Sequence, residues 1–386
     1  MKKIIYLDNA ATTEIHPDVL NEMLPFFKKM YGNPSSIYSL AKSSKRGINL
    51  ARERVAKALN ASTKEIYFTS GGTESDNWAI KGIAFANEKK GKHIITSCIE
   101  HHAVLHTCEY LTKYGFEITY LPVSEKGIID VKELERAIRK DTTLVSIMFA
   151  NNEIGTIQPI KEIGEIAKKN NIYFHTDAVQ AIGNVSIDVE KLNIDLLSLS
   201  AHKINGPKGI GALYIREGVN ISSMIHGGMQ EFGRRAGTEN VAGIIGLGKA
   251  IELSTNDITR KTGYLKELRD YTIDEIVKRI PDTIVNGDRV KRLANNINIC
   301  FKYIEGESIL LMLDHEGICA SSGSACTSGS LEPSHVLLAI GLPHEIAHGS
   351  LRLTLSKNNS KEEIDYVIER LTAIVKNLRE LSPLNK

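Results

Sequence analysis

The sequence predicts an α/β fold in which a large domain, with a mostly parallel sheet and helices on both faces, precedes a smaller α+β C-terminal domain. Two observations predict it. Short apolar runs alternate with segments of helical period through the middle of the chain, an order that requires crossover connections between parallel strands. After about residue 256 the pattern changes to a long charged helix followed by further strands. A chain of 386 residues, 42% of them hydrophobic, can fill both cores.

The expected elements follow in chain order. Strands of the large domain are expected at residues 66–69, 93–96, 117–121, 144–149, 172–176 and 195–200, with helices between some of them at 131–139 and 160–169. The smaller domain is expected to contain a helix at 261–280, strands at 296–301 and 350–355, and a terminal helix. That last helix begins with a capping box, Ser360 and Glu363. We therefore place the large domain at 1–256, with its N-terminal segment packing on the smaller domain at 257–386.

Composition narrows the range of partners. A formal net charge of +2 and a pI near 8.1, without a block of like charge, indicate neither a nucleic-acid partner nor a membrane surface. The initial apolar run stops at Asp8, and no later run approaches the roughly 20 apolar residues of a transmembrane helix. We expect a cytoplasmic protein. The five cysteines contain no CxxC pair, which argues against a disulfide framework or a four-thiolate zinc site.

Two charged residues follow successive predicted strands. Asp177 ends an apolar strand, and Lys203 follows the next strand beside a glycine-rich turn. A lysine amine condenses with an aldehyde cofactor, and a carboxylate opposite keeps a pyridine nitrogen protonated. Either residue alone is more often an ordinary surface lysine or a helix cap. Their positions on successive strand ends, which meet at one edge of a parallel sheet, favour the cofactor interpretation.

A run of small residues between a strand and a helix predicts a phosphate site. The run is Ser70-Gly71-Gly72-Thr73. Unpaired amides and the helix dipole attract an anion there, and glycine allows close approach of the backbone. Neither the Walker lysine pattern nor GxGxxG is present, so a small phosphate ligand is favoured over a nucleotide. Without the other motifs, this run would be interpreted as an ordinary glycine-containing turn.

Taken together, these motifs resemble the class V family of pyridoxal-phosphate (PLP) enzymes, and most closely its NifS/IscS group of cysteine desulfurases. The resemblance rests on segments 200–203 and 177–180, supported by 6–13, 100–104, 151–155, 235–240 and 321–335. Its implied fold is fold type I of PLP-dependent transferases. Its implied activity is release of sulfur from L-cysteine, with L-alanine as the other product, for iron–sulfur cluster assembly or other sulfur transfer.

The resemblance also implies a role for each matching residue. Lys203 would hold PLP covalently, Asp177 would pair with the ring nitrogen, and His101 would lie against the ring and move protons. Asn152 and Gln180 would bind the cofactor hydroxyl or the substrate. Gly72, Thr73, Ser200 and His202 would hold the phosphate, joined by Thr238 from the second subunit of a homodimer.

Two further residues complete the expected site. Arg352 alternates with leucines on a predicted strand and is suited to grip the substrate carboxylate, although an arginine so placed also fits a structural salt bridge. Cys326 lies in a segment of small residues, from 320 to 330, without a large anchoring side chain. A thiolate there would attack the substrate sulfur and carry it as a persulfide. An inert cysteine is the ordinary alternative.

Other interpretations stay open at this point. A selenocysteine lyase or a class V transaminase would share the fold, and a non-catalytic dinucleotide-binding or scaffold protein would need no cofactor lysine. No resident metal is expected, because the histidines lack HExxH spacing, but Cys326 is a candidate transient ligand of an iron–sulfur cluster. An iron–sulfur scaffold or another sulfur-acceptor protein is the expected partner, and its identity is not indicated.

Overall fold

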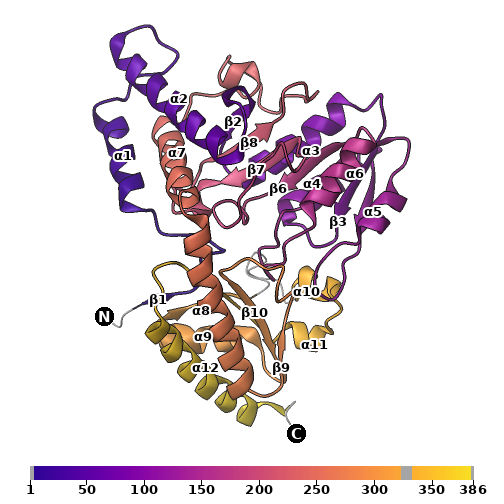
Figure 1. Ribbon diagram of the computed structural model, residues 1–386, viewed down its shortest axis with the longest axis vertical. Coiled ribbons are helices and arrows are strands. Elements are labelled where there is room, and N and C mark those ends of the chain that lie inside the picture. The colour runs from indigo at the N-terminus through magenta and orange to yellow at the C-terminus, as the bar shows by residue number, and fades with distance from the viewer. Residues whose placement is uncertain (1–3, 323–332, 384–386) are drawn as a thin grey trace.

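The computed structural model describes residues 4–322 and 333–383. Figure 1 shows a large lobe above, built on a seven-stranded sheet, and a small lobe below, built on a three-stranded sheet, with the helix α8 running down from one to the other. The boundary near residue 256 falls between α7 (Val241–Thr255) and α8 (Ile258–Arg279). As a division between two independently folding domains, that boundary stays a prediction.

The large sheet is mostly parallel, as the sequence predicts. Its strands lie in the order β2-β8-β7-β6-β5-β3-β4. The five strands from β7 to β4 pair in parallel, whereas β8 pairs antiparallel with both β2 and β7. In chain order the strands are β2 (Ile66–Thr69), β3 (His93–Ser97), β4 (Glu117–Leu121), β5 (Thr142–Ser146), β6 (Tyr173–Asp177), β7 (Leu196–Ser200) and β8 (Gly211–Ile215).

Helices cover both faces of this sheet. Side chains alternate along each strand, so neighbouring residues of β3 enter different cores: Ile95 packs in the cluster with α2, α6 and α7, and Ile94 in the cluster with α3 and α4. The helices are α1 (Pro17–Lys28), α2 (Ser39–Leu59), α3 (Gly72–Ala86), α4 (His102–Thr112), α5 (Val131–Ala137), α6 (Ile160–Lys169) and α7, with short 3₁₀ turns η1 (Thr63–Glu65), η2 (Ala201–Lys203) and η3 (Glu231–Gly233).

The small lobe has its own apolar core. Its sheet has the order β12-β10-β9 with antiparallel pairs. The three leucines expected on one face, Leu351, Leu353 and Leu355, are buried in this core, and the predicted capping box of Ser360 and Glu363 is present. The elements are α8, β9 (Thr283–Val285), β10 (Asn296–Phe301), α9 (Gly306–His315), β11 (Ile318–Cys319), α10 (His335–Ala339), α11 (His344–Ala347), β12 (Ser350–Thr354) and α12 (Lys361–Leu381).

The N-terminal segment connects the lobes. Its strand β1 (Ile5–Tyr6) pairs in parallel with β11 of the small lobe. Beyond it, the Ala10 N–H donates a hydrogen bond to Thr354 Oγ1, whereas Thr13 Oγ1 donates to the carbonyl oxygen of His202 in the large lobe. The segment is therefore fixed to both lobes. No helix of the described residues is long and apolar enough to cross a membrane.

Three elements differ from the expectation by more than one residue at an end. The strand expected at 144–149 is β5, at 142–146, and the helix expected at 131–139 ends at Ala137. The long charged helix begins at Ile258 instead of 261, and the sequence did not predict β8 at all.

Candidate active site

The structure brings ten of the predicted residues together around one cavity of about 290 Å³. They are Gly72, Thr73, His101, Asn152, Asp177, Gln180, Ser200, His202, Lys203 and Arg352. Thr238 is exposed and does not line this cavity within the protomer. Cys326 lies outside the described residues.

The parallel sheet explains why Lys203 meets Asp177. β6 ends at Asp177 and β7 ends at Ser200, and because the two strands are parallel neighbours, both carboxyl ends lie at the same edge. The turn η2 then places Lys203 at the cavity wall. Its Nζ donates hydrogen bonds of 2.6 Å to the carbonyl oxygens of Ala10 and Ala11. The N-terminal segment thus orients the amine.

Asp177 is almost completely buried. Its Oδ1 accepts a hydrogen bond of 2.9 Å from the N–H of Val179, which fixes the carboxyl group at the end of β6. Burial raises the pKa of Asp177 to about 6, a rise that the hydrogen bond from Val179 and the positive charge of Lys203 oppose. At neutral pH the carboxylate is therefore ionised and suited to a protonated ring nitrogen.

A second buried carboxyl group, which sequence reasoning missed, also lines the cavity. Asp76, on α3, has a pKa well above its ordinary value because of burial and the neighbouring Asp177. Its Oδ1 lies 3.6 Å from His175 Nε2. The His175 ring is held between Ser146 Oγ and Ser198 Oγ, at 2.8 Å and 3.0 Å. Two adjacent buried carboxylates repel each other, which favours protonation of one of them. Asp76 is the protonated, neutral group, and the negative charge lies on Asp177.

His101 is a neutral hydrogen-bond donor in this setting. It is the N-cap of α4, where its Nδ1 accepts a hydrogen bond from the Ala103 N–H. Burial and the charge of Lys203 lower the pKa of His101 to about 4. With Nδ1 occupied as an acceptor, the proton of the neutral ring is assigned to Nε2.

Small residues shape the other end of the cavity for a phosphate group. The N-cap of α3 is Gly71, which has no side chain to satisfy the first amides of the helix. A Cβ atom at Gly72 would lie 2.7 Å from Val179 Cγ2, so close approach of the backbone is built into this turn. Ser200 and His202 complete this wall. These groups fit PLP. The amides at the helix start and the hydroxyl groups suit its phosphate, the lysine amine suits its aldehyde, and the buried carboxylate suits its ring nitrogen.

The contact at Gly72 gives a stability prediction. Gly72→Ala should destabilise the protein by about 1 kcal/mol more in the presence of Val179 than in a Val179→Ala background, because the added methyl group collides with Val179 Cγ2. Urea unfolding of the two single variants, the double variant and the unmodified chain measures this difference. Additive effects, within about 0.3 kcal/mol, would show that the turn accommodates alanine without strain.

Arg352 is both a salt-bridge partner and an available donor. Its Nη2 lies 2.9 Å from Asp8 Oδ1, and its Nη1 donates to the carbonyl oxygen of Asn152 at 3.1 Å. Its buried Nε has no hydrogen-bond partner among the described residues. A guanidinium can bind a ligand carboxylate through two hydrogen bonds, and Arg352 lines the cavity in which such a ligand would lie. Asp8 is a second site residue that sequence reasoning missed.

Four cysteines fall within the described residues, and all have free thiols. Burial raises the pKa of Cys108 to about 12 and that of Cys300 to about 11, and the thiols of Cys98 and Cys319 also have raised pKa values. Raised pKa values keep these thiols protonated at neutral pH, which makes them poor nucleophiles.

Comparisons with known proteins identify the family. The sequence model of the family described as "Aminotransferase class-V" matches residues 5–367 of this chain. The chain is 64% identical to "Cysteine desulfurase IscS" of Methanosarcina thermophila, over 99% of this chain and 94% of the relative. A solved structure described as "NIFS-LIKE PROTEIN" superposes with a TM-score of 0.92 at 40% identity and covers 97% of this chain and 100% of its own. Another, described as "SspA in complex with cysteine", has a TM-score of 0.82 at 38% identity and covers 93% and 100%.

The matches extend over nearly the whole length of the chain and of its relatives, and the cavity has the donor set that the cofactor of this family needs. The protein therefore belongs to the class-V aminotransferase family of PLP enzymes and, within it, to the NifS/IscS group of cysteine desulfurases.

Proposed function

We propose that this protein converts L-cysteine to L-alanine and carries the released sulfur as a persulfide on Cys326, for delivery to an acceptor protein. The observation that carries the proposal is that Lys203, Asp177, His101 and Arg352 line one cavity. A lysine amine, a buried carboxylate, a neutral histidine and a guanidinium are the groups that amino-acid chemistry on a PLP ring requires. The cysteine-bound solved structure and the relative named for desulfurase activity support L-cysteine as the substrate.

Each residue has a distinct task in this proposal. Bound PLP supplies an aldehyde for covalent attachment of the amino acid and a ring that accepts electrons from its α-carbon. Lys203 would hold the cofactor through its Nζ and would take the α-proton of the bound amino acid. Asp177 would hold the proton on the ring nitrogen, and Gly72, Thr73, Ser200 and His202 would bind the phosphate.

Substrate orientation is the task of the remaining residues. Arg352 binds the α-carboxylate through its guanidinium, with Asn152 beside it. His101 Nε2 lies on the cavity wall as a neutral donor and moves protons at the substrate. The Cys326 thiolate attacks the substrate sulfur: its Sγ forms the new sulfur–sulfur bond while the bond from the substrate Cβ to sulfur breaks. The electron pair of that bond goes to the substrate Cβ, which takes up a proton to give alanine.

A homodimer completes the proposed site. Thr238 is exposed in the protomer and lies outside its own cavity, so it is available to reach the phosphate of a second subunit. Exposed apolar side chains, including Met229 and Phe232, lie in the same part of the chain. We propose iron–sulfur cluster assembly as the destination of the sulfur, through a scaffold or another acceptor protein.

The experiment that tests this function is Cys326→Ser. We expect the variant to keep the yellow cofactor and to bind cysteine, but to transfer sulfur to an acceptor at least about a hundredfold more slowly, because a hydroxyl cannot carry a persulfide. Alanine and sulfide production, measured with and without a thiol acceptor, provide the readout. Cys319→Ser is the matched control and should behave like the unmodified enzyme. Undiminished transfer by the Cys326→Ser variant would refute the proposed sulfur carrier.

A further inference from the structure

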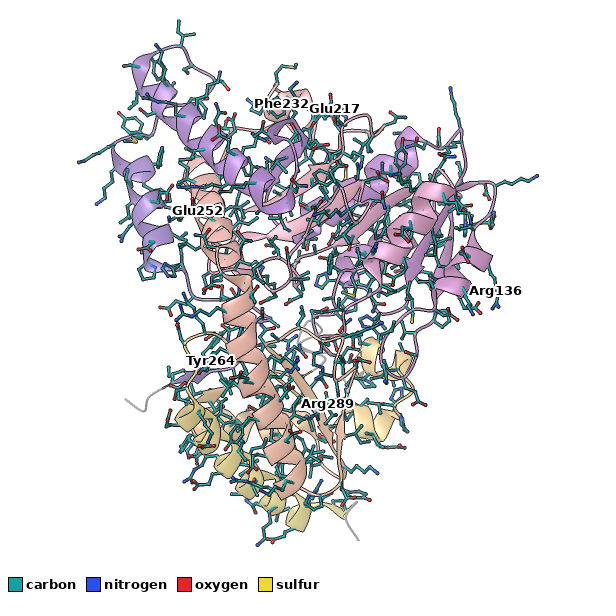
Figure 2. All side chains as sticks on the ribbon, viewed as in Figure 1. Arg136, Glu217, Phe232, Glu252, Tyr264 and Arg289 are labelled. Atoms are coloured by element: carbon teal, nitrogen blue, oxygen red, sulfur yellow. The ribbon has the colours of Figure 1, made fainter. Side chains whose placement is uncertain are left out.

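A second cavity, of about 560 Å³, shares Gln180 and Lys203 with the cofactor cavity. It lies where the two lobes meet. Its wall is formed by residues of the N-terminal segment, the end of α7, the start of α8 and segment 355–358. Tyr264, labelled beside α8 in Figure 2, also lines it, and its hydroxyl group donates to the carbonyl oxygen of Asn359. None of the tasks assigned above uses this space.

The charges around this cavity favour an anion. The charged or titrating side chains that line it are His16, Lys203, Asp257, Arg260, Lys261 and Lys357. Asp257 is the single carboxylate among these lining residues, which also include three lysines and one arginine. Lys261 has no carboxylate within 4 Å among the described residues, whereas three of the six cations of α8, namely Arg269, Lys278 and Arg279, are paired with acids. A small ligand with a negatively charged group would supply the missing counter-charge.

Lys261 is also placed to act as a nucleophile. Its Nζ donates hydrogen bonds to the carbonyl oxygens of Gly183 and Ser254. A neutral amine has two hydrogens, so these two carbonyls are satisfied without a third proton, and the lone pair stays available. Burial lowers the pKa of Lys261 to about 8, and the charge of Lys357 acts in the same direction. About a tenth of the amine is therefore uncharged at pH 7, and about half at pH 8.

We propose that this second cavity binds small acyl phosphates and that they acylate the amine of Lys261. Arg260 and Lys357 attract the phosphate and Lys261 Nζ attacks the acyl carbon. An amide N–C bond forms, and the bond from the acyl carbon to the phosphate oxygen breaks. Inorganic phosphate leaves with the electron pair, and the proton lost from nitrogen passes to phosphate or solvent. No redox change occurs. The modification removes the positive charge of Lys261 from a cavity that Lys203 also lines.

The test uses the cofactor-loaded protein and acetyl phosphate at pH 8. Peptide mass spectrometry compares acetylation of Lys261 with that of Lys266, an exposed lysine on the same helix. We expect an initial rate at Lys261 at least about tenfold higher, saturating with acetyl phosphate concentration and suppressed by inorganic phosphate. The rate at Lys261 should rise through its pKa of about 8 and level off above about pH 9, where nearly all of its amine is deprotonated.

Two variants sharpen the test. The double variant Arg260→Gln/Lys357→Gln should lower the rate at Lys261 severalfold and abolish competition by inorganic phosphate, with no change at Lys266. The Lys261→Arg variant should lose the modified peptide and leave the acetylation of Lys266 unchanged. The proposal is overturned if Lys261 reacts no faster than Lys266, if its rate rises linearly with acetyl phosphate, or if inorganic phosphate has no effect.

Discussion

Replacing Lys203 with alanine is expected to lower kcat/KM for cysteine desulfuration by about a thousandfold or more, because the variant loses the amine that moves the α-proton. On the proposed assignment, it also loses the covalent bond to the cofactor. Borohydride reduction followed by denaturation tests the second effect: unmodified enzyme should keep the reduced cofactor on the peptide that contains residue 203, and the variant should release it.

The matched control for this prediction is Lys208→Ala. Lys208 is exposed on the same glycine-rich turn but does not line the cofactor cavity. We expect this variant to keep both the covalent label and the activity. If the Lys203→Ala variant still retained reduced cofactor at another lysine, the assignment of Lys203 would be wrong.

Asp177→Asn is expected to weaken PLP binding about 10-fold to 100-fold at pH 8, the usual loss when a charged hydrogen bond is replaced by a neutral one. The effect should depend on pH. In the cofactor-free protein the pKa of Asp177 is raised to about 6, whereas a protonated ring nitrogen would hold the carboxylate ionised in the complex. Lowering the pH through 6 therefore favours the free protein, and affinity should fall by up to about tenfold per pH unit.

Binding constants for PLP from pH 5 to pH 8 measure this dependence. The phosphate group of the ligand titrates in the same range, so the informative quantity is the difference between the unmodified protein and the variant. His101 and His202 do not interfere, because burial lowers both pKa values to about 4. Asp188→Asn is the control, since the Asp188 carboxyl has a pKa of about 2 and stays ionised throughout. Parallel curves for the unmodified protein and Asp177→Asn would contradict the assignment.

The sequence predicted the elements whose signals are local. Apolar runs located the strands that end at Asp177 and Ser200, and parallel pairing then placed the two strand ends at one edge. The capping box of Ser360 and Glu363 depends only on residues three apart, and it is present. The motif of small residues around Gly72 was equally informative. It lies between β2 and the start of α3, so the two elements that position it are its neighbours in the sequence.

The features that the sequence did not predict depend on tertiary pairing. Asp76 has the spacing of an ordinary polar helix residue, and only the packing of α3 on the sheet buries it beside Asp177. The ion pair of Asp8 with Arg352 joins residues 344 positions apart. The short strand β8 lacks a preceding crossover helix, and its insertion between β2 and β7 is a property of the sheet order.

The N-terminal segment has a consequence for how the enzyme is made. The carbonyl oxygens of Ala10 and Ala11 accept hydrogen bonds from Lys203, and the neighbouring Ala10 N–H is held by Thr354, which follows 344 positions later. During synthesis Lys203 becomes available to these carbonyls about midway along the chain, whereas Thr354 becomes available only after β12 has been made. The N-terminal segment therefore becomes fixed to the small lobe only after β12 has left the ribosome.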